Sequence, residues 1–288
     1  MMQDAHELNS RINEKYAGMS KRQKLIAEYI LENFDKAAFM TALKLGEKVG
    51  TSESTVVRFA MMLGYDGYPA MQEALQEMVR HKLTTIQRME LAGDMDESMV
   101  LRQVLKTDTN NIRLTLDAID TAVYDEVVST IAGCRRLYIM GVRSSAPLAQ
   151  FMGYYLNFML DNVHVVTSGV NDVLEQLMHI SEGDVLVCIS FPRYARRTVE
   201  GAKYARERGA RVVAITDSVL SPLAEFADHT LIAQSDMASF VDSLVAPLSV
   251  INALIVSLGL KKREEVSKYF GELEHIWDQY MVYMNKDL

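Results

Sequence analysis

The sequence predicts two joined folds: an all-α helix-turn-helix domain at the N-terminus and an α/β sandwich built on a parallel sheet. A short helix, a tight turn and a second helix fill residues 45–68, and strand-like and helix-like segments alternate from residue 136 onward. Such alternation favours a parallel sheet with helices on its faces. We expect this division of the chain: a helix-turn-helix domain at 1–80, a helical linker at 81–107, the α/β domain at 108–262 and a C-terminal helix at 263–288.

The residues that begin and end its helices mark the helix-turn-helix segment. Gly50 permits the sharp turn, and Thr51 or Ser52 is placed to cap the second helix. Gly64 is placed to end that helix, and Ser20 is placed to cap an earlier amphipathic helix. The second helix has one apolar stripe at helical spacing: Val56, Phe59, Ala60 and Leu63. Its opposite face is polar, as in a helix that is presented to the major groove of DNA.

Three runs in this segment resemble the N-terminal domain of the RpiR family of bacterial transcriptional regulators: LGEKVGTS at 45–52, STVVRF at 54–59 and LGYDGY at 63–68. The resemblance implies DNA contacts from six side chains: Lys44 and Lys48 to the backbone, and Ser52, Ser54, Thr55 and Arg58 near base edges or phosphates. Arg58 is the best candidate for a guanine contact, since arginine pairs with guanine bidentately. The alternative is a solvated Arg58, or one paired with Glu53 or Asp66.

One residue departs from that family pattern. Gly46 stands where the family usually has alanine. A glycine inside a helix costs about 1 kcal/mol relative to alanine. A closer approach of two helices could compensate for this cost.

The loops that follow the predicted strands are candidates for a ligand site. Open parallel sheets bind ligands at the carboxyl ends of their strands. Four loops there carry small or hydroxyl residues: 141–145, 167–171, 190–194 and 216–218. Free N–H groups and dipoles at helix N-termini favour an anion such as phosphate. Simple helix capping is the alternative explanation for any one of these loops.

This half of the chain resembles the SIS (sugar isomerase) domain, in which Gly141 and Ser145 match the first loop and Ser190 opens the second. Matches continue through ITDS at 215–218 and SPLA at 221–224. The resemblance implies a sugar-phosphate site, with two departures. Arg143 stands where a second glycine is common, and FPRYA at 191–195 replaces the usual Ser-Gly-x-Ser/Thr phosphate cradle.

These departures replace hydrogen-bond donors by charge. Pro192 has no backbone N–H and Ala195 has no hydroxyl, whereas guanidinium groups bind phosphate or carboxylate bidentately. The predicted effector-binding residues are Gly141, Arg143, Ser144, Ser145, Ser190, Arg193 and Tyr194, with help from Arg196 and Arg197. In the alternative interpretation, Arg196 and Arg197 lie on the outward face of the next helix and Arg193 pairs with Asp172 or Asp217.

Composition narrows the class of protein. The 288 residues carry a net charge of −8, which argues against nonspecific coating of nucleic acid, and the first 80 residues are nearly balanced. We therefore expect the protein to be a dimer or tetramer that binds a palindromic double-stranded operator. Its other expected partner is a small anionic carbohydrate effector, with no membrane, cofactor or metal. Isolated Cys134 and Cys188, without a secretory signal, favour the cytoplasm and structural roles for both thiols.

Two other functions compete with the regulator. An SIS-type sugar-phosphate isomerase would need a proton-transfer group, and Glu175, His179, Glu225 and His229 are candidates. An isomerase would have no use for the N-terminal helix-turn-helix domain, which we call the reader. A pure assembly module is the third possibility. The C-terminal segment 264–284 has apolar residues at helical spacing and is expected to pack on its own sheet or on a second subunit.

Overall fold

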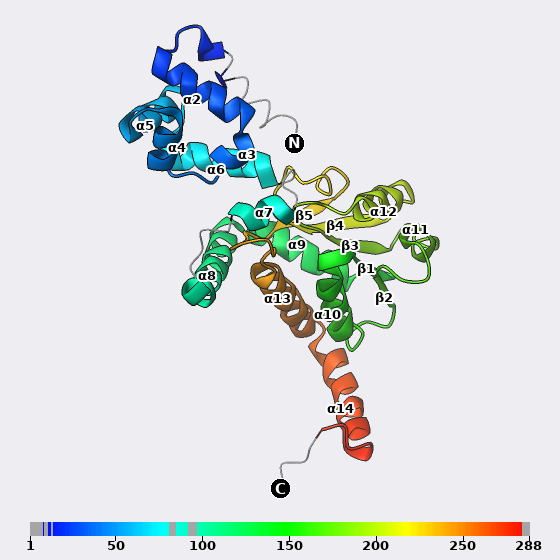
Figure 1. The fold of residues 1–288 in the computed structure, drawn as a ribbon. Coiled ribbons are helices and arrows are strands. Elements are labelled where there is room, and N and C mark those ends of the chain that lie inside the picture. The colour runs from blue at the N-terminus through cyan, green and yellow to red at the C-terminus, as the bar shows by residue number, and fades with distance from the viewer. Residues whose placement is uncertain (1–7, 9–10, 13, 81–84, 92–96, 284–288) are drawn as a thin grey trace. The chain divides into compact units, whose positions relative to one another are not determined.

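The computed structural model describes residues 8, 11–12, 14–80, 85–91 and 97–283 (Figure 1). The chain divides into two compact units, Met1–Val100 with Ala238–Val241 and Leu101–Met237 with Asp242–Leu288. The division after Val100 falls inside the predicted linker 81–107. A break that the sequence suggests at Gly93 and Asp94 lies outside the described residues.

The first unit is helical. Its helices are α2 (Lys21–Glu32), α3 (Phe34–Ala37), α4 (Ala42–Val49), α5 (Glu53–Met62), α6 (Tyr68–Arg80) and α7 (Thr85–Leu91), followed by the short 3-10 helix η1 (Glu97–Met99). The predicted cap of α2 is confirmed: Ser20 Oγ accepts a hydrogen bond from the Gln23 backbone N–H, and the Gln23 side chain accepts one from Ser20. The α5 stripe is fully buried, with Phe59 among the largest enclosed side chains.

The second unit is built on a sheet of five parallel strands in the order β2-β1-β3-β4-β5. The strands are β1 (Leu137–Gly141), β2 (Val163–Val166), β3 (Val185–Ile189), β4 (Arg211–Thr216) and β5 (His229–Ile232). The helices are α8 (Val100–Ala118), α9 (Thr121–Ala132), α10 (Ala146–Leu156), α11 (Val173–Gln176), α12 (Arg196–Glu207), α13 (Val245–Lys261) and α14 (Arg263–Gln279), with the 3-10 turn η2 (Arg143–Ser145). This confirms the predicted parallel α/β fold.

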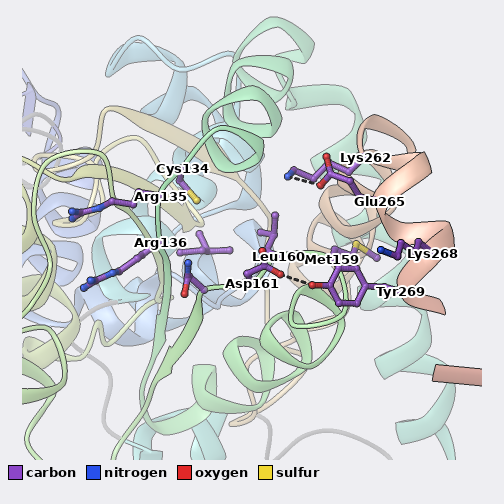
Figure 2. Close-up of a pocket in the computed structure, with 12 residues that line it drawn as sticks. Cys134, Arg135, Arg136, Met159, Leu160, Asp161, Lys262, Glu265, Lys268 and Tyr269 are labelled. Carbon is purple, nitrogen blue, oxygen red and sulfur yellow. Dashed lines mark hydrogen bonds and ion pairs between the residues drawn. The ribbon is translucent and has the colours of Figure 1, made fainter. Parts of the chain in front are cut away.

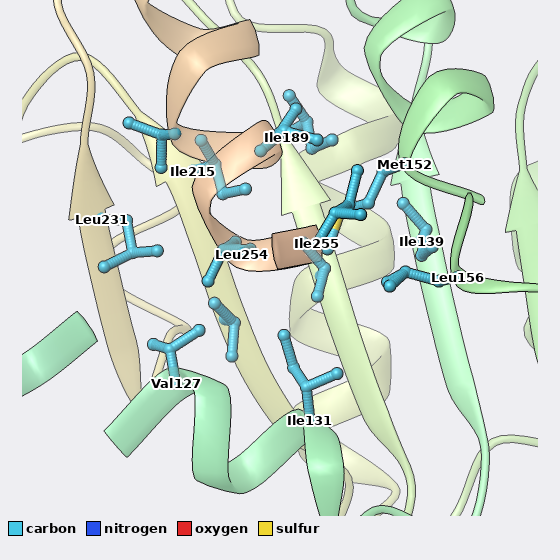
Figure 3. Close-up of a cluster of buried hydrophobic side chains, with 14 of the residues drawn as sticks. Val127, Ile131, Ile139, Met152, Leu156, Ile189, Ile215, Leu231, Leu254 and Ile255 are labelled. Carbon is cyan, nitrogen blue, oxygen red and sulfur yellow. The ribbon is translucent and has the colours of Figure 1, made fainter. Parts of the chain in front are cut away.

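Helices cover both faces of the sheet, as the alternating side chains of the central strands require. Leu137 and Ile139 face a cluster with residues of α9, α10 and α13, which Figure 3 shows. Tyr138 and Met140 face a second cluster with α11 and α12. Both β1 and β3 are buried along their whole length, which explains their continuous apolar sequences.

The two thiols take the structural positions expected of them. Cys188 is a free, buried cysteine in the α11–α12 cluster, and burial raises the pKa of its thiol. Cys134 is a free, half-buried cysteine, and burial raises the pKa of its thiol to about 11. A thiol with a raised pKa is a poor nucleophile near neutral pH.

Helix α14 only partly meets its predicted role in packing. It follows α13 with a bend of 100°, and Val266 is its one buried residue. The rings of Phe270 and Trp277 pack near Phe158, which follows α10 in the chain, with centroids 6.1 and 6.4 Å away. No single helix in the described ranges has the length and hydropathy to cross a membrane, although the bent pair α13 and α14 passes that test on length and composition together.

Candidate functional site

Five of the six side chains predicted to contact DNA are exposed on α5, just before it or on α4. Ser54 and Arg58 on α5, Ser52 just before it, and Lys44 and Lys48 on α4 are exposed. Figure 1 shows these two helices next to each other in the first unit.

Thr55 is the exception and corrects the prediction. Its side chain is only 9% exposed, and its Oγ1 lies 2.8 Å from Ser52 Oγ. A buried hydroxyl that is shared with a neighbouring serine is not available to a base edge. Ser52 does occupy the predicted position before α5, but its side chain makes no cap hydrogen bond to the backbone. Its hydroxyl instead lies 3.1 Å from Ser54 Oγ.

Arg58 extends along its own helix. Its Nε donates a hydrogen bond to the Ser54 backbone carbonyl over 3.2 Å. The side chain is otherwise exposed, so its guanidinium lies on the outer face of α5. This is the position that a contact with the major groove needs.

The turn between α4 and α5 explains the glycine that departs from the family pattern. Gly50 ends α4 with a φ of +70°, as predicted for a sharp turn. The chain then passes so close to α4 that a Cβ on Gly46 would lie 2.9 Å from the Thr51 backbone oxygen. Gly46 therefore permits this close approach, which compensates for its low helix propensity. Gly64, with a φ of +91°, follows the end of α5 as predicted.

The candidate effector site lies where the sheet order changes direction. Strands β1 and β3 are neighbours at the centre of the sheet, but β1 leads to α10 on one face and β3 leads to α12 on the other. The connections that follow β1 and β3 therefore diverge at the carboxyl edge of the sheet, and this is where open α/β sheets bind ligands. The predicted loops 141–145 and 190–194 are the two that meet there.

Small residues lie in the two loops at this edge of the sheet. Ser145 and Ser190 are buried, and Ser190 Oγ accepts a hydrogen bond from the Ala195 backbone N–H over 3.4 Å. Gly141 is required by a close approach, because a Cβ there would lie 2.5 Å from the Ser145 carbonyl oxygen. Ser144 is exposed beside them.

Two arginines adopt a backbone conformation that favours glycine. Arg143 has a φ of +56° and Arg193 a φ of +65°, and both side chains are exposed. Left-handed backbone at a non-glycine residue costs of order 1–3 kcal/mol and is concentrated at functional sites. One of these arginines follows β1 and the other follows β3, so both lie at the carboxyl edge. Arg143 thus keeps a glycine-like backbone while it adds a guanidinium.

The two neighbouring arginines do not join this pair. Arg197 forms ion pairs with Asp172 at 3.1 Å and with Glu200 at 3.0 Å, and Arg196 pairs with Glu200 at 2.7 Å. Hydrogen bonds from both arginines lower the pKa of Glu200. The alternative interpretation is therefore correct for Arg196 and Arg197, which lie on the outer face of α12.

Tyr194 connects the loop after β3 to the end of the neighbouring strand β4 by a hydrogen bond. Its hydroxyl donates a hydrogen bond to Asp217 Oδ1 over 2.8 Å, and Thr216 Oγ1 donates to the same oxygen over 3.2 Å. Asp217 and Thr216 are buried. The ITDS run at 215–218 was visible in the sequence, but nothing in its pattern indicated that Asp217 accepts the hydroxyl of Tyr194.

A pocket also forms beside the predicted loop after β2. It has a volume of about 330 Å³ and is lined by Ser168, Gly169, Val170, Asn171, Asp172, Val173 and Arg197. A different pocket, of about 410 Å³, lies at the amino edge of the sheet beside α14 (Figure 2). There the Tyr269 hydroxyl donates to Asp161 over 2.6 Å, while the guanidinium groups of Arg135 and Arg136 point away from Tyr269.

The residues considered for isomerase chemistry do not converge. Glu175 completes the N-terminal cap of α11 by accepting a hydrogen bond from the Asp172 backbone N–H. His229 begins β5, at the amino edge opposite the candidate loops, and lies 3.4 Å from Glu126. His179 and Glu225 are exposed. Among the described residues, no group of three or more His, Cys, Asp or Glu side chains could hold a metal ion.

A helix-turn-helix with a polar outer face, joined in one chain to an α/β ligand domain, defines a class of protein: a transcriptional regulator with a ligand-binding domain. The helix-turn-helix domain of the rpiR family matches residues 6–82, and the SIS domain matches residues 130–257. The chain is thus an RpiR-type transcriptional regulator, with an N-terminal helix-turn-helix domain and a C-terminal SIS domain.

Relatives share this organisation. The chain is 28% identical over 224 residues to an HTH-type transcriptional regulator, YfhH, of Escherichia coli strain K12, covering 77% of this chain and 79% of the relative. The sugar isomerase domain of an RpiR transcription factor from Sphaerobacter thermophilus is 28% identical and covers 62% of this chain and 99% of its own, with a TM-score of 0.59. The Vibrio vulnificus NanR protein, solved in complex with ManNAc-6P, is 22% identical with a TM-score of 0.59 and covers 96% of this chain and 100% of its own.

Proposed function

We propose that this protein is a cytoplasmic regulator of carbohydrate-related metabolism that binds a palindromic operator and responds to a small anionic sugar derivative. The observation that carries the effector proposal is the pair of left-handed arginines, Arg143 and Arg193, at the carboxyl edge of β1 and β3. Two exposed arginines with strained backbone, in the same loops as the buried Ser145 and Ser190, suit a phosphate or a carboxylate.

The reader proposal rests on the outer face of α5. Arg58 and Ser54 are exposed there, and Lys44 and Lys48 lie exposed on α4, from which they would reach phosphates. Thr55 is not among the proposed base-contacting residues, because it is buried. The remaining set is small, so one reader is expected to bind weakly and two readers to bind cooperatively at two half-sites.

The effector is proposed to be a phosphosugar or a sugar acid. NanR of Vibrio vulnificus, which shares the fold, was solved with ManNAc-6P bound. In this chain Pro192 still removes one backbone donor from the usual phosphate loop, so the guanidinium groups are proposed to supply the lost contacts. His229 begins β5 at the opposite edge and Glu175 is engaged in the cap of α11, which supports a sensing role over catalysis.

A second copy of the chain is the proposed partner of α8. The outer stripe of this helix is apolar and repeats at the spacing of helical turns: Leu101, Leu105, Ile112 and Leu116. Leu101 is 73% exposed and Leu116 is 72% exposed. Exposed apolar side chains gathered along one side of a helix mark an interaction surface in a water-soluble domain. Pairing of two such helices would give the two readers that a palindrome requires.

The test of this function is selection of genomic DNA fragments by the full-length protein at physiological salt, with and without a panel of sugar phosphates and sugar acids that begins with ManNAc-6P. We expect enrichment of fragments that share a palindrome, and a change in retention with one class of anion. Absence of an enriched sequence under every condition would contradict the reader. Enrichment that no anion alters would contradict the proposed effector class.

A further inference from the structure

Helix α8 is attached to the α/β domain by its polar face. Only two of its residues are buried, and both are polar: Asn111 is fully buried and Thr115 is 5% exposed. Asp108, Asn111 and Thr115 lie at the spacing i, i+3 and i+7, on one face of the helix. The exposed stripe of Leu101, Leu105, Ile112 and Leu116 runs beside this face, and Asp108, three residues after Leu105 and four before Ile112, lies on the border between the two. This inverts the usual arrangement, in which a helix buries its apolar face.

The buried polar residues bind the segment that joins β5 to α13. Thr115 Oγ1 accepts the Gln234 backbone N–H over 2.8 Å. The Asn111 carboxamide donates to the Asp236 carbonyl over 2.8 Å and accepts the Asp236 N–H over 3.3 Å. At the other end of the segment, Ser243 Oγ donates to Asp108 over 2.6 Å. We call Asp108, Asn111 and Thr115, with these bonds, the α8 clasp.

The clasp is continuous with the candidate effector edge. Tyr194, beside Arg193, donates to Asp217, which directly follows Thr216 at the end of β4. The Thr216 carbonyl accepts the Ala233 N–H over 2.8 Å, and the next residue, Gln234, donates to the clasp. Hydrogen-bonded groups with defined geometry therefore run from the loop after β3 to α8, across the ends of β4 and β5.

We propose that this network couples the effector edge to α8, and that Asn111 and Thr115 are the positioning residues of that coupling. The proposal rests on the proposed function, because it names how that ligand edge is regulated. A ligand that engages the 190–194 loop alters the Tyr194–Asp217 hydrogen bond and shifts the balance between two placements of α8. It does so only by its differential affinity for those placements. Helix α8 follows the first unit in the chain, so its placement sets where the reader is tethered.

Attachment of α8 by hydrogen bonds allows a change between two placements of this helix more readily than attachment by apolar packing would. A net hydrogen bond between protein groups is weak, because the released groups bind water instead. An apolar helix face would hold α8 in one position, whereas polar bonds can break and reform at little net cost. The buried location still makes the bonded geometry specific, since an unsatisfied buried group is unfavourable.

The first experiment needs neither DNA nor effector. Backbone hydrogen exchange is measured on the full-length protein and on the Tyr194→Phe variant, which lacks the hydroxyl that binds Asp217. We expect the amides of Ala233, Gln234 and Asp236 to exchange at least three times faster in this variant. Tyr204→Phe on α12 is the control and is expected to leave these rates unchanged. Equal rates in wild type and Tyr194→Phe would overturn the coupling.

The second experiment tests the positioning role at Thr115. Thr115→Val removes the hydroxyl and keeps the shape, Thr115→Ser keeps the hydroxyl, and Thr109→Val removes a hydroxyl that bonds to the Leu105 carbonyl of its own helix. On an operator fragment, we expect Thr115→Val to change the dissociation constant at least fivefold. We expect Thr115→Ser and Thr109→Val to match wild type.

A merely structural role would lower the midpoint of thermal unfolding without this pattern of DNA affinities. Unchanged DNA affinity in a folded Thr115→Val protein would contradict the positioning role. If the wild type retains no DNA, the proposed function fails, and the hydrogen-exchange comparison still decides the coupling by itself.

Discussion

At the scale of single residues, two charged side chains belong to residues with an unfavourable, left-handed backbone conformation. Arg143 and Arg193 hold a conformation that glycine adopts without cost. Each side chain is exposed at the carboxyl edge of the sheet, so packing alone does not account for the strain. We propose that the pair forms an anion site, in which the strained backbone would position both guanidinium groups before the ligand arrives.

The first prediction concerns this pair. We expect Arg143→Gln together with Arg193→Gln to weaken binding of the sugar phosphate or sugar acid identified by DNA selection at least tenfold, which corresponds to about 1.4 kcal/mol. Isothermal titration of wild type and variant measures the change. The matched control is Arg196→Gln with Arg197→Gln, because these two arginines are committed to carboxylates. A similar loss in the control would show a general charge effect instead of a defined clamp.

The second prediction concerns Gly46. Alanine would favour the helix by about 1 kcal/mol, but its Cβ would lie 2.9 Å from the Thr51 oxygen. Because that oxygen belongs to the backbone of the turn, it cannot move aside as a flexible side chain would. We therefore expect Gly46→Ala to lower the free energy of unfolding by roughly 1–3 kcal/mol, the usual cost of overpacking. Urea unfolding measures it, and a gain in stability would show that the turn can move.

At the scale of elements, sequence patterns predicted those parts that local chemistry decides. Ser20 caps α2, Gly50 makes the turn, and the apolar runs become the buried strands. Periodicity did not show how long each helix is: the helix between β2 and β3 is a single turn, α11. It also did not reveal the α8 clasp, because Asn111 and Asp236 are 125 residues apart and pair only in the folded chain.

The third prediction tests α5 as the element that reads DNA. Arg58→Ala should cost about 1–3 kcal/mol of affinity for the operator and relax the base preference at one position, as expected for a lost guanine contact. Fluorescence anisotropy on operator variants measures both effects. Arg22→Ala on α2 removes the same exposed charge from a different helix and should have a smaller effect. If Arg58→Ala binds every sequence more weakly by one common factor, the arginine contacts a phosphate instead.

At the scale of the whole molecule, the two units divide the work. The first presents a polar helix, and the second joins the candidate effector edge to α8 through hydrogen bonds. The sequence could predict which elements carry the two candidate sites, but not the network between Tyr194 and α8, since its bonds depend on the ends of β4 and β5 lying side by side. The resemblance to known families identified the two domains in the sequence, whereas the left-handed backbone of Arg143 and Arg193 could be seen only in the structure.

The fourth prediction concerns assembly. We expect Leu105→Glu combined with Leu116→Glu to shift the protein from oligomer to monomer, because a charge placed in an apolar interface must be desolvated. Analytical ultracentrifugation over a range of concentrations measures the shift. Gln103→Glu adds one of these two negative charges at an exposed position of α8 outside the stripe and should leave the association unchanged. An oligomer that survives the double substitution would place the self-association surface elsewhere.

The left-handed backbone at Arg143 also bears on how the protein would respond to selection in the laboratory. Arg143→Gly should raise the free energy of unfolding by about 1 kcal/mol, whereas Arg143→Ala should not, because alanine keeps the Cβ that makes this conformation unfavourable. A library screened for heat resistance alone would therefore enrich glycine at this position. The selected variants would be more stable but would bind the proposed effector more weakly. Measuring the midpoint of thermal unfolding and the ligand affinity of each variant would show that the two properties change in opposite directions.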